Sequence, residues 1–304
     1  MSWQSCLFSF IARPLKMALA RRNYPEAKTL LNTVLAAVGR LSHIPSSVSC
    51  TTASLNAVPC EWIIASEAKE RQRVIVYFHG GVFAVGSPNS HRDLAWRLSE
   101  AAAAKVLLVD YRLTPEHIFP AAIDDGIGVY QWLLENGYSA PHIAFAGDSA
   151  GGNLTLSVML KARQLSLPLP AASACLSPWA DLSHQGESIE RNQSQDPLMP
   201  VSLLVNAAKV YAPQQDLSAP LLSPVFADYV GFPPLLIYAG SSEILLSDAT
   251  RIQAQAEKAG VKVSLKIWKN QLHAFPVFAR FIPEGRKAIQ LMGVFIKSNM
   301  EKGE

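Results

Sequence analysis

The sequence predicts an α/β protein with a mostly parallel central sheet and helices on both faces. Apolar strand-like segments alternate with helix-like segments through most of the chain, which is typical of such a sheet. The prediction centres on residues 141–160, where a short apolar strand, a glycine-framed turn and a helix follow one another. The chain has 304 residues, 49% hydrophobic and 17% charged, which suits one large globular domain or two ordinary ones.

The first half of the chain begins with a helical segment over residues 1–45, because Leu31, Val34, Leu35 and Val38 recur at helical spacing. We expect this segment to pack on the sheet or to roof a site. The elements expected next are strands over 48–53, 61–65 and 74–78, a helix over 87–104, a strand over 105–110, a helix over 121–135, a strand over 142–146 and a helix from 152.

The second half continues the alternation around one polar, proline-punctuated insert. We expect strands over 171–176, 235–238 and 261–268 and helices over 201–211, 246–259 and 284–298. The predicted organisation is therefore N-terminal cap helices (1–45), a first part of the core (46–182), a cap insert (183–221) and a second part of the core (222–304).

Ser149 is the candidate nucleophile, because it stands in Gly147-Asp148-Ser149-Ala150-Gly151 between a strand and a helix. In this context G-x-S-x-G is a nucleophile elbow, whose sharp turn leaves no room for side chains at the glycines. The helix dipole also favours an anion at its N-terminus. The alternative is a glycine-rich strand-to-helix turn with an incidental serine.

A second glycine-containing loop follows the strand over 74–78. His79-Gly80-Gly81 resembles the loop whose backbone N–H groups bind the oxyanion in lipases and esterases. Val82 stands where a third glycine is common, so a β-branched residue would have to adopt that backbone geometry if its N–H took part.

Glu243 and His273 complete a candidate catalytic triad. In folds with a nucleophile elbow, the nucleophile, the acid and the histidine follow one another in this order along the chain. Glu243 and His273 have this order after Ser149, and each directly follows a predicted strand. The histidine would act as the base and the acid would orient it. Asp248 is the competing acid; its place in the first turn of a predicted helix also suits a residue that complements the helix dipole.

Other functions find little support in the sequence. The net charge of +3 without a Lys/Arg stripe gives no indication of nucleic-acid binding. The four cysteines show no metal-ligand spacing, and no dinucleotide- or ATP-binding motif occurs, so we expect no metal or cofactor. We expect the cysteines to be reduced thiols, with a Cys50–Cys60 disulfide as the alternative. The apolar N-terminus lacks a basic region before its hydrophobic part, and its longest uncharged run is too short for a membrane span, so we expect no stable membrane insertion and a cytoplasmic location.

The segments HGGVF, YRLTPEHIFPAA, GDSAGG, LSPWADLS, DPLM, GSSEILLSDA and LHAF occur in this order. Together they resemble the bacterial hormone-sensitive-lipase-type esterases of the α/β-hydrolase fold. The resemblance implies Ser149 as nucleophile, His273 as base, and N–H groups of Gly80, Gly81 and Ala150 as oxyanion donors, with Val82 left open. The family usually has Asp where Glu243 stands. It also implies a helical cap and a homodimer.

We therefore expect a serine carboxylesterase that forms an acyl-enzyme on small esters. Short acyl chains are favoured, because the cap would enclose the site and the sequence shows no exposed lipid-binding stretch. Two alternatives stay open: amide, lactam or thioester hydrolysis on the same triad, and a non-catalytic ligand-binding protein, against which the presence of His273 argues.

Overall fold

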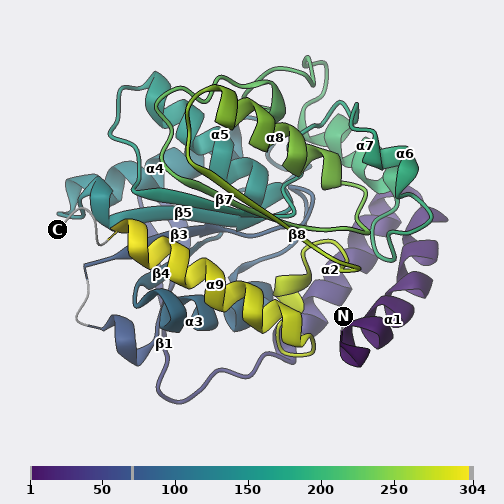
Figure 1. The fold of residues 1–304 in the computed structure, drawn as a ribbon, viewed down its shortest axis with the longest axis horizontal. Coiled ribbons are helices and arrows are strands. Elements are labelled where there is room, and N and C mark those ends of the chain that lie inside the picture. Colours follow the sequence, from purple (N-terminus) through teal and green to yellow (C-terminus); the bar gives the residue numbers. More distant parts are fainter. Residues whose placement is uncertain (1, 70–71, 301–304) are drawn as a thin grey trace.

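The computed structural model describes residues 2–69 and 72–300 and has one eight-stranded sheet at its centre (Figure 1). The strands are β1 (Ser49–Leu55), β2 (Val58–Ile64), β3 (Val74–Phe78), β4 (Lys105–Val109), β5 (Ile143–Asp148), β6 (Ala172–Leu176), β7 (Leu235–Gly240) and β8 (Val263–Trp268). Their order is β1-β2-β4-β3-β5-β6-β7-β8, with β2 antiparallel to both its neighbours and all other pairs parallel. The predicted fold class is confirmed.

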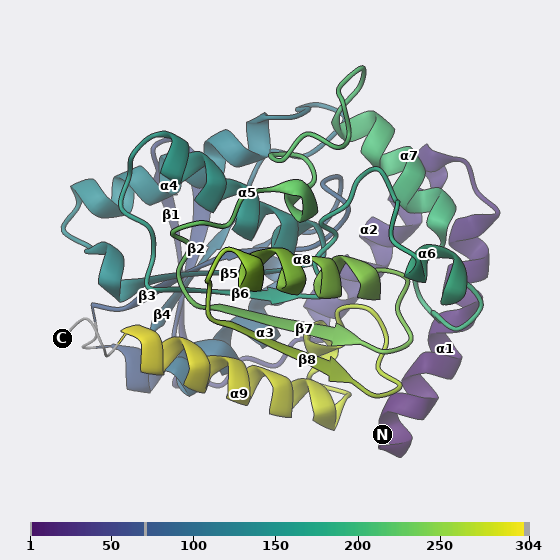
Figure 2. The ribbon, with the colours of Figure 1, turned by 45° about the horizontal axis from the view of Figure 1, so that its top comes forward.

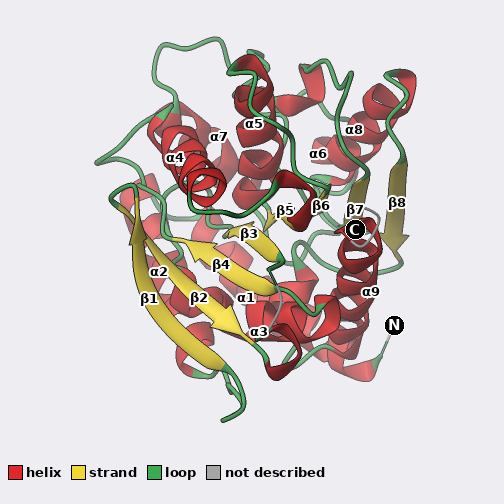
Figure 3. Cartoon of the chain, turned by 90° about the vertical axis from the view of Figure 1, so that its left-hand side faces the viewer, coloured by secondary structure: helices red, strands yellow, loops and turns green. Residues whose placement is uncertain are grey.

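Helices cover both faces of the sheet, as Figure 3 shows. They are α3 (Pro88–Ala102), α4 (Ala121–Glu135), α5 (Ala150–Gln164), α8 (Leu246–Lys258) and α9 (Pro283–Met300), with short 3-10 turns at Ser66–Ala68, Ala140–His142, Pro224–Phe226 and Phe275–Phe278. Alternate residues of β3 enter opposite cores, since successive strand side chains point to opposite faces. Val76 and Phe78 pack with α4 and α5, whereas Ile75 and Tyr77 pack with α3 and α9.

The first two strands differ from their expected positions. A polar turn was expected between 53 and 61, but β1 and β2 pair as far as Leu55 and Val58. Only Asn56 and Ala57 form the turn, both with positive φ (48° and 65°), as a two-residue hairpin requires. The polar residues before this turn lie at the solvent-exposed edge of the sheet, where hydrophobicity is not needed for strand pairing.

Four helices gather beyond the carboxyl ends of the parallel strands (Figures 1 and 2). They are α1 (Trp3–Ala20), α2 (Tyr24–Arg40), α6 (Ser188–Arg191) and α7 (Val201–Tyr211). Asn23 caps α2 by accepting the N–H of Glu26, and α1 packs against α2, α7 and α9. In the described part of the chain, no helix combines the length and the apolar character that crossing a membrane requires.

Candidate active site

Ser149 lies at the sharp turn between β5 and α5. Its backbone has φ 54° and ψ −119°, a strained conformation for a residue other than glycine. A Cβ at Gly147 would lie 2.3 Å from the carbonyl oxygen of Gly151, and one at Gly151 would lie 1.9 Å from that of Phe78. The two glycines are therefore required because backbone passes too close for any side chain.

His273 and Glu243 meet in the loops that follow β8 and β7. The Nδ1 of His273 lies 2.9 Å from Oε2 of Glu243, and both side chains are buried. Oε1 of Glu243 accepts the N–H of Gly240 at 2.8 Å, so both carboxylate oxygens are engaged. This arrangement fixes the imidazole ring and leaves its Nε2 as the nitrogen that is not bound to the carboxylate.

The charge of Glu243 controls the protonation of His273. Burial alone would lower the pKa of His273, but the hydrogen bond that His273 donates to Glu243 and the negative charge of Glu243 outweigh burial and raise that pKa above its ordinary 6.5. Burial raises the pKa of Glu243, against the opposing effect of its hydrogen bonds with His273 and Ser177. The site therefore stabilises an imidazolium beside a buried carboxylate.

The insert after β6 braces the loop of Glu243. Asn192 donates from Nδ2 to the carbonyl oxygen of Glu243 at 2.9 Å. Asp196 accepts the N–H of Ile244 at 3.0 Å through Oδ2. Its Oδ1 accepts the N–H groups of Leu198 and Met199, which places the DPLM segment against the site.

Asp248, the competing acid, lies elsewhere. Its Oδ2 accepts the backbone N–H groups of Ala180 and Asp181 at 2.8 and 2.9 Å, and its side chain is buried. Asp248 thus ties the loop after β6 to the start of α8, and the structure does not bring it to His273.

Asp148 connects the elbow to the loop after β3, and this corrects one expectation. Its Oδ1 accepts the N–H of Gly80 at 3.1 Å and the hydroxyl of Tyr77 at 2.9 Å, and lies 3.1 Å from Nε2 of His91. Since the N–H of Gly80 is already bound to a carboxylate, Gly80 is wrong as an oxyanion donor. Its role is to hold the loop.

This buried cluster keeps Asp148 ionised. Burial would raise the pKa of Asp148, but the charge of His91 and the hydrogen bonds from His91 and Tyr77 lower it overall. His79 stacks on Tyr111 with ring centroids 4.3 Å apart, and burial lowers the pKa of His79 to about 4, so its ring is neutral. No local pattern identified His91 as part of this cluster, because it lies inside α3 and reaches Asp148 only in the folded chain.

The next residues of the loop present free N–H groups. Among residues 2–69 and 72–300, no hydrogen-bond acceptor faces the N–H of Gly81 or Val82. Gly81 has φ 127° and a Cβ there would lie 2.0 Å from the carbonyl oxygen of Val85. Val82 has φ 52°, so this β-branched residue does adopt the left-handed geometry. Ala150 is the first residue of α5, where an N–H has no intrahelical partner.

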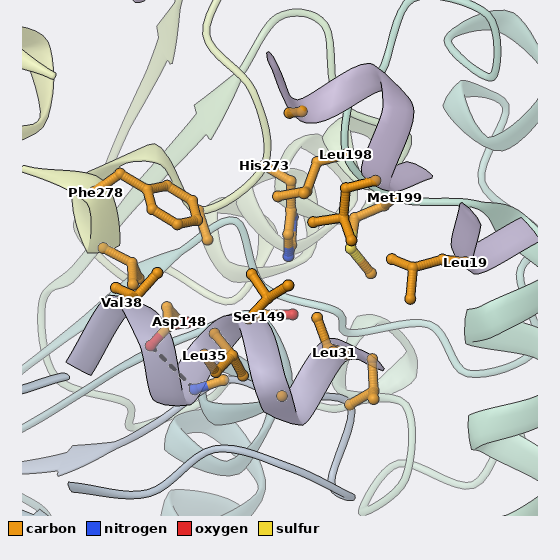
Figure 4. A pocket seen from close by; sticks show the side chains of 18 of the residues that line it. Leu19, Leu31, Leu35, Val38, Asp148, Ser149, Leu198, Met199, His273 and Phe278 are labelled. Atoms are coloured by element: carbon orange, nitrogen blue, oxygen red, sulfur yellow. Dashed lines mark hydrogen bonds between the residues drawn. The ribbon is translucent and has the colours of Figure 1, made fainter. Parts of the chain in front are cut away.

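These groups surround one cavity of about 280 Å³ (Figure 4). Ser149, His273, Gly81 and Val82 line it on the side of the sheet. The remaining walls are largely apolar and come from α1, α2, the insert and the turn after β8, with Phe8, Leu15, Leu19, Leu31, Leu35, Val38, Leu198, Met199 and Phe278 among the contributors. In the described ranges, no cluster of three or more His, Cys, Asp or Glu could hold a metal ion.

Known proteins resemble the chain over most of its length. A family model described as alpha/beta hydrolase fold matches residues 75–277. An acetyl-hydrolase of Streptomyces hygroscopicus is 40% identical over 243 residues, 80% of this chain and 81% of the relative. The crystal structure of an esterase from the bacterial hormone-sensitive lipase family superposes with TM-score 0.92 at 36% identity, covering 99% of both chains. An esterase crystal soaked with p-nitrophenyl butyrate gives TM-score 0.90 at 34% identity, over 99% of this chain and 100% of that one.

Proposed function

The chain belongs to the bacterial hormone-sensitive-lipase-type esterases of the α/β-hydrolase fold, and we propose that it hydrolyses short-chain carboxylic esters through a Ser149–His273–Glu243 triad. One observation carries this proposal: His273 is held on Glu243 by a 2.9 Å hydrogen bond at the cavity that Ser149 lines. The relatives show that the protein is an esterase. The identity of the triad residues and the preference for short acyl chains are what we propose.

In the proposed mechanism, the Ser149 hydroxyl attacks the ester carbonyl while Nε2 of His273 takes its proton. Glu243 holds the ring in the tautomer with a proton on Nδ1 and stabilises the resulting cation. The tetrahedral oxyanion binds to the N–H groups of Gly81 and Ala150, with the N–H of Val82 as a third candidate donor. His273 then donates this proton to the oxygen of the leaving alcohol. In the second half of the reaction, His273 takes a proton from the attacking water and returns it to the Ser149 oxygen as the acyl group leaves as the acid.

The cavity supports a small, apolar acyl group. Its volume of about 280 Å³ lies just below the roughly 300–1,000 Å³ that is usual for ligand sites. Residues 1–45 and 183–221 would form the cap that closes it, since α1, α2 and the Leu198-Met199 segment supply its walls. One relative is named an acetyl-hydrolase, and crystals of a similar protein were soaked with p-nitrophenyl butyrate; both acyl groups are small enough for a cavity of this size.

A chain-length series tests this function directly. The enzyme should hydrolyse p-nitrophenyl esters with kcat/KM highest at about C4 to C6 and falling at longer chains, because the cavity excludes them. Leu35 lines the cavity on α2, so Leu35→Phe should reduce turnover of the hexanoate more than that of the acetate. Ala37, exposed on the same helix, provides the control: Ala37→Phe should leave the series unchanged. Preference for C12 or longer chains would contradict the proposal.

Amide, lactam and thioester hydrolysis would use the same groups and are tested with acyl-matched substrates. Butyryl p-nitroanilide or a butyryl thioester hydrolysed faster than the butyrate ester would replace the ester assignment. A homodimer and a cytoplasmic location stay predictions, which analytical ultracentrifugation and cell fractionation test.

A further inference from the structure

α1 is apolar on two opposite faces. Its inner face carries the buried Ala12 and Leu19 and lines the cavity. Its outer face exposes large apolar side chains: Trp3 (70%), Leu7, Phe10 (73%), Ile11 and Met17. Residues 3, 7, 10, 14 and 17 recur at three- and four-residue intervals, so they form one stripe along the helix. In Figures 1 and 2 this helix lies at the periphery of the molecule.

The exposed stripe is a feature that was not evident from the sequence. The sequence indicates an apolar, amphipathic helix here, but spacing alone does not show which of its apolar side chains remain exposed. α1 packs through one face only, with Phe8 on that side 4.6 Å from the ring centroid of Phe278. A contiguous exposed apolar surface of this kind marks an interaction site.

The apolar stripe is continuous with the mouth of the cavity. Ile11 is 61% exposed and also lines the cavity. Phe8 and Leu15, toward the inner side, line it as well. An apolar molecule that contacts the outer face of α1 is therefore separated from the cavity only by the width of this helix.

The charged residues of α1 and of the turn that follows it are all basic, whereas Glu284 of α9 accepts hydrogen bonds from Ser2 and Ser5 at the start of the helix. The first 25 residues contain Arg13, Lys16, Arg21 and Arg22 and no Asp or Glu. Lys16 donates to the carbonyl oxygens of Gln193 and Asp196, whereas Arg13 and Arg21 are exposed beside the stripe. Exposed Trp and Phe with flanking Arg are the composition of helices that lie in a membrane interface and bind anionic lipid.

We propose that the outer face of α1 docks the enzyme on an anionic lipid surface, with Trp3 and Phe10 immersed at the level of the headgroups. Docking would place the cavity mouth next to apolar esters dissolved in that surface. A second copy of the chain fits less well, because pairing two outer faces would bring the Arg13 and Arg21 side chains of both copies together without an acidic partner on α1.

Vesicle co-sedimentation tests the proposal independently of catalysis. The full chain carrying Ser149→Ala is mixed with vesicles of phosphatidylcholine alone or of phosphatidylcholine with phosphatidylglycerol. It should bind the anionic vesicles more tightly, and binding should weaken as salt is added. Because this variant has no nucleophile, failure of the triad and failure of docking are separate results.

Matched substitutions identify the surface. Trp3→Gln with Phe10→Gln should reduce vesicle binding by at least about tenfold. The control is Val230→Gln with Val294→Gln, two positions 59% and 57% exposed outside α1, which should bind like the parent. Arg13→Gln and Arg21→Gln should each weaken binding to anionic vesicles by about fivefold, the equivalent of about 1 kcal/mol per charge. When the same substitutions are made in the active enzyme, which keeps Ser149, all these variants should retain turnover of soluble p-nitrophenyl acetate.

Four results would overturn the proposal. These are absence of binding to anionic vesicles, equal binding to neutral and anionic vesicles, and unchanged binding of the Trp3→Gln/Phe10→Gln protein. The fourth is a dimer, seen by analytical ultracentrifugation without lipid, that this double substitution converts to monomer, since the outer face would then belong to a second copy.

Discussion

Replacing Glu243 by Gln removes one charge from a fully buried position without changing its shape. The amide cannot satisfy both partners of the carboxylate, which are Nδ1 of His273 at 2.9 Å and the N–H of Gly240 at 2.8 Å. If its oxygen faces His273, its NH2 meets the N–H of Gly240, donor against donor. If its NH2 faces His273, Nδ1 must accept, and the proton moves to Nε2, which can then no longer receive the proton of Ser149.

Both orientations impair the base while the nucleophile stays in place. We expect kcat to fall by about three to four orders of magnitude, as amide replacement of a triad carboxylate does, which corresponds to about 4–5 kcal/mol of transition-state stabilisation. The matched control is Asp248→Asn, because an Asn oxygen can still accept the N–H groups of Ala180 and Asp181. This control should keep kcat within about fivefold, a change of only about 1 kcal/mol.

Steady-state kinetics on p-nitrophenyl butyrate, with circular dichroism to verify folding, provides the assay. Glu243 is not the triad acid if Glu243→Gln retains more than a tenth of the parent kcat, or if Asp248→Asn is the impaired protein.

Four further predictions concern the pH dependence of activity and stability and the loop after β3. His273 acts as a base only when neutral and its pKa is raised, so kcat/KM should rise with pH through an apparent pKa above 6.5. Glu243→Gln should move this limb to lower pH, because the lowering effect of burial is then opposed only by the weaker effects of Asp196 and Asp148. The same raised pKa contributes stability below pH 6.5 that is lost as pH rises through the folded value, which urea titrations of parent and His273→Gln would measure. Asp148→Asn should lower the free energy of unfolding by about 1.5–3 kcal/mol, the range for a hydrogen bond to a charged group, and should reduce kcat by loosening the Gly80 loop; unchanged values of both would contradict that role. Gly81→Ala should abolish activity because its Cβ would lie 2.0 Å from a carbonyl oxygen, and full activity would show that the loop is not needed in this geometry.

The sequence was sufficient wherever a local pattern dictates geometry. Gly147 and Gly151 were expected to exclude side chains at the turn, and the close backbone approaches there confirm this steric reason. The helices over 121–135 and 201–211 have the predicted bounds, since apolar spacing and flanking residues determine them locally.

Roles that depend on which distant groups meet could not be predicted. The N–H of Gly80 was expected to be available, but Asp148, 68 residues further on, accepts it. Asp248 lies in the first turn of a helix as expected, but the sequence did not indicate that it would be buried and would accept N–H groups from the loop after β6. The outer face of α1 was equally inaccessible to sequence reasoning, because spacing identifies apolar residues but not which of them remain exposed.

The central claim is that Ser149 is the nucleophile, and covalent labelling tests it most directly. A fluorophosphonate probe should form one adduct on the parent, and peptide mapping by mass spectrometry should locate it at Ser149. Ser149→Ala should abolish labelling and lower kcat by about six orders of magnitude, as nucleophile removal does in serine hydrolases. Ser157→Ala, a buried serine on the same helix, should label like the parent. An adduct on another residue, or a Ser149→Ala protein with a tenth of the parent activity, would contradict the account.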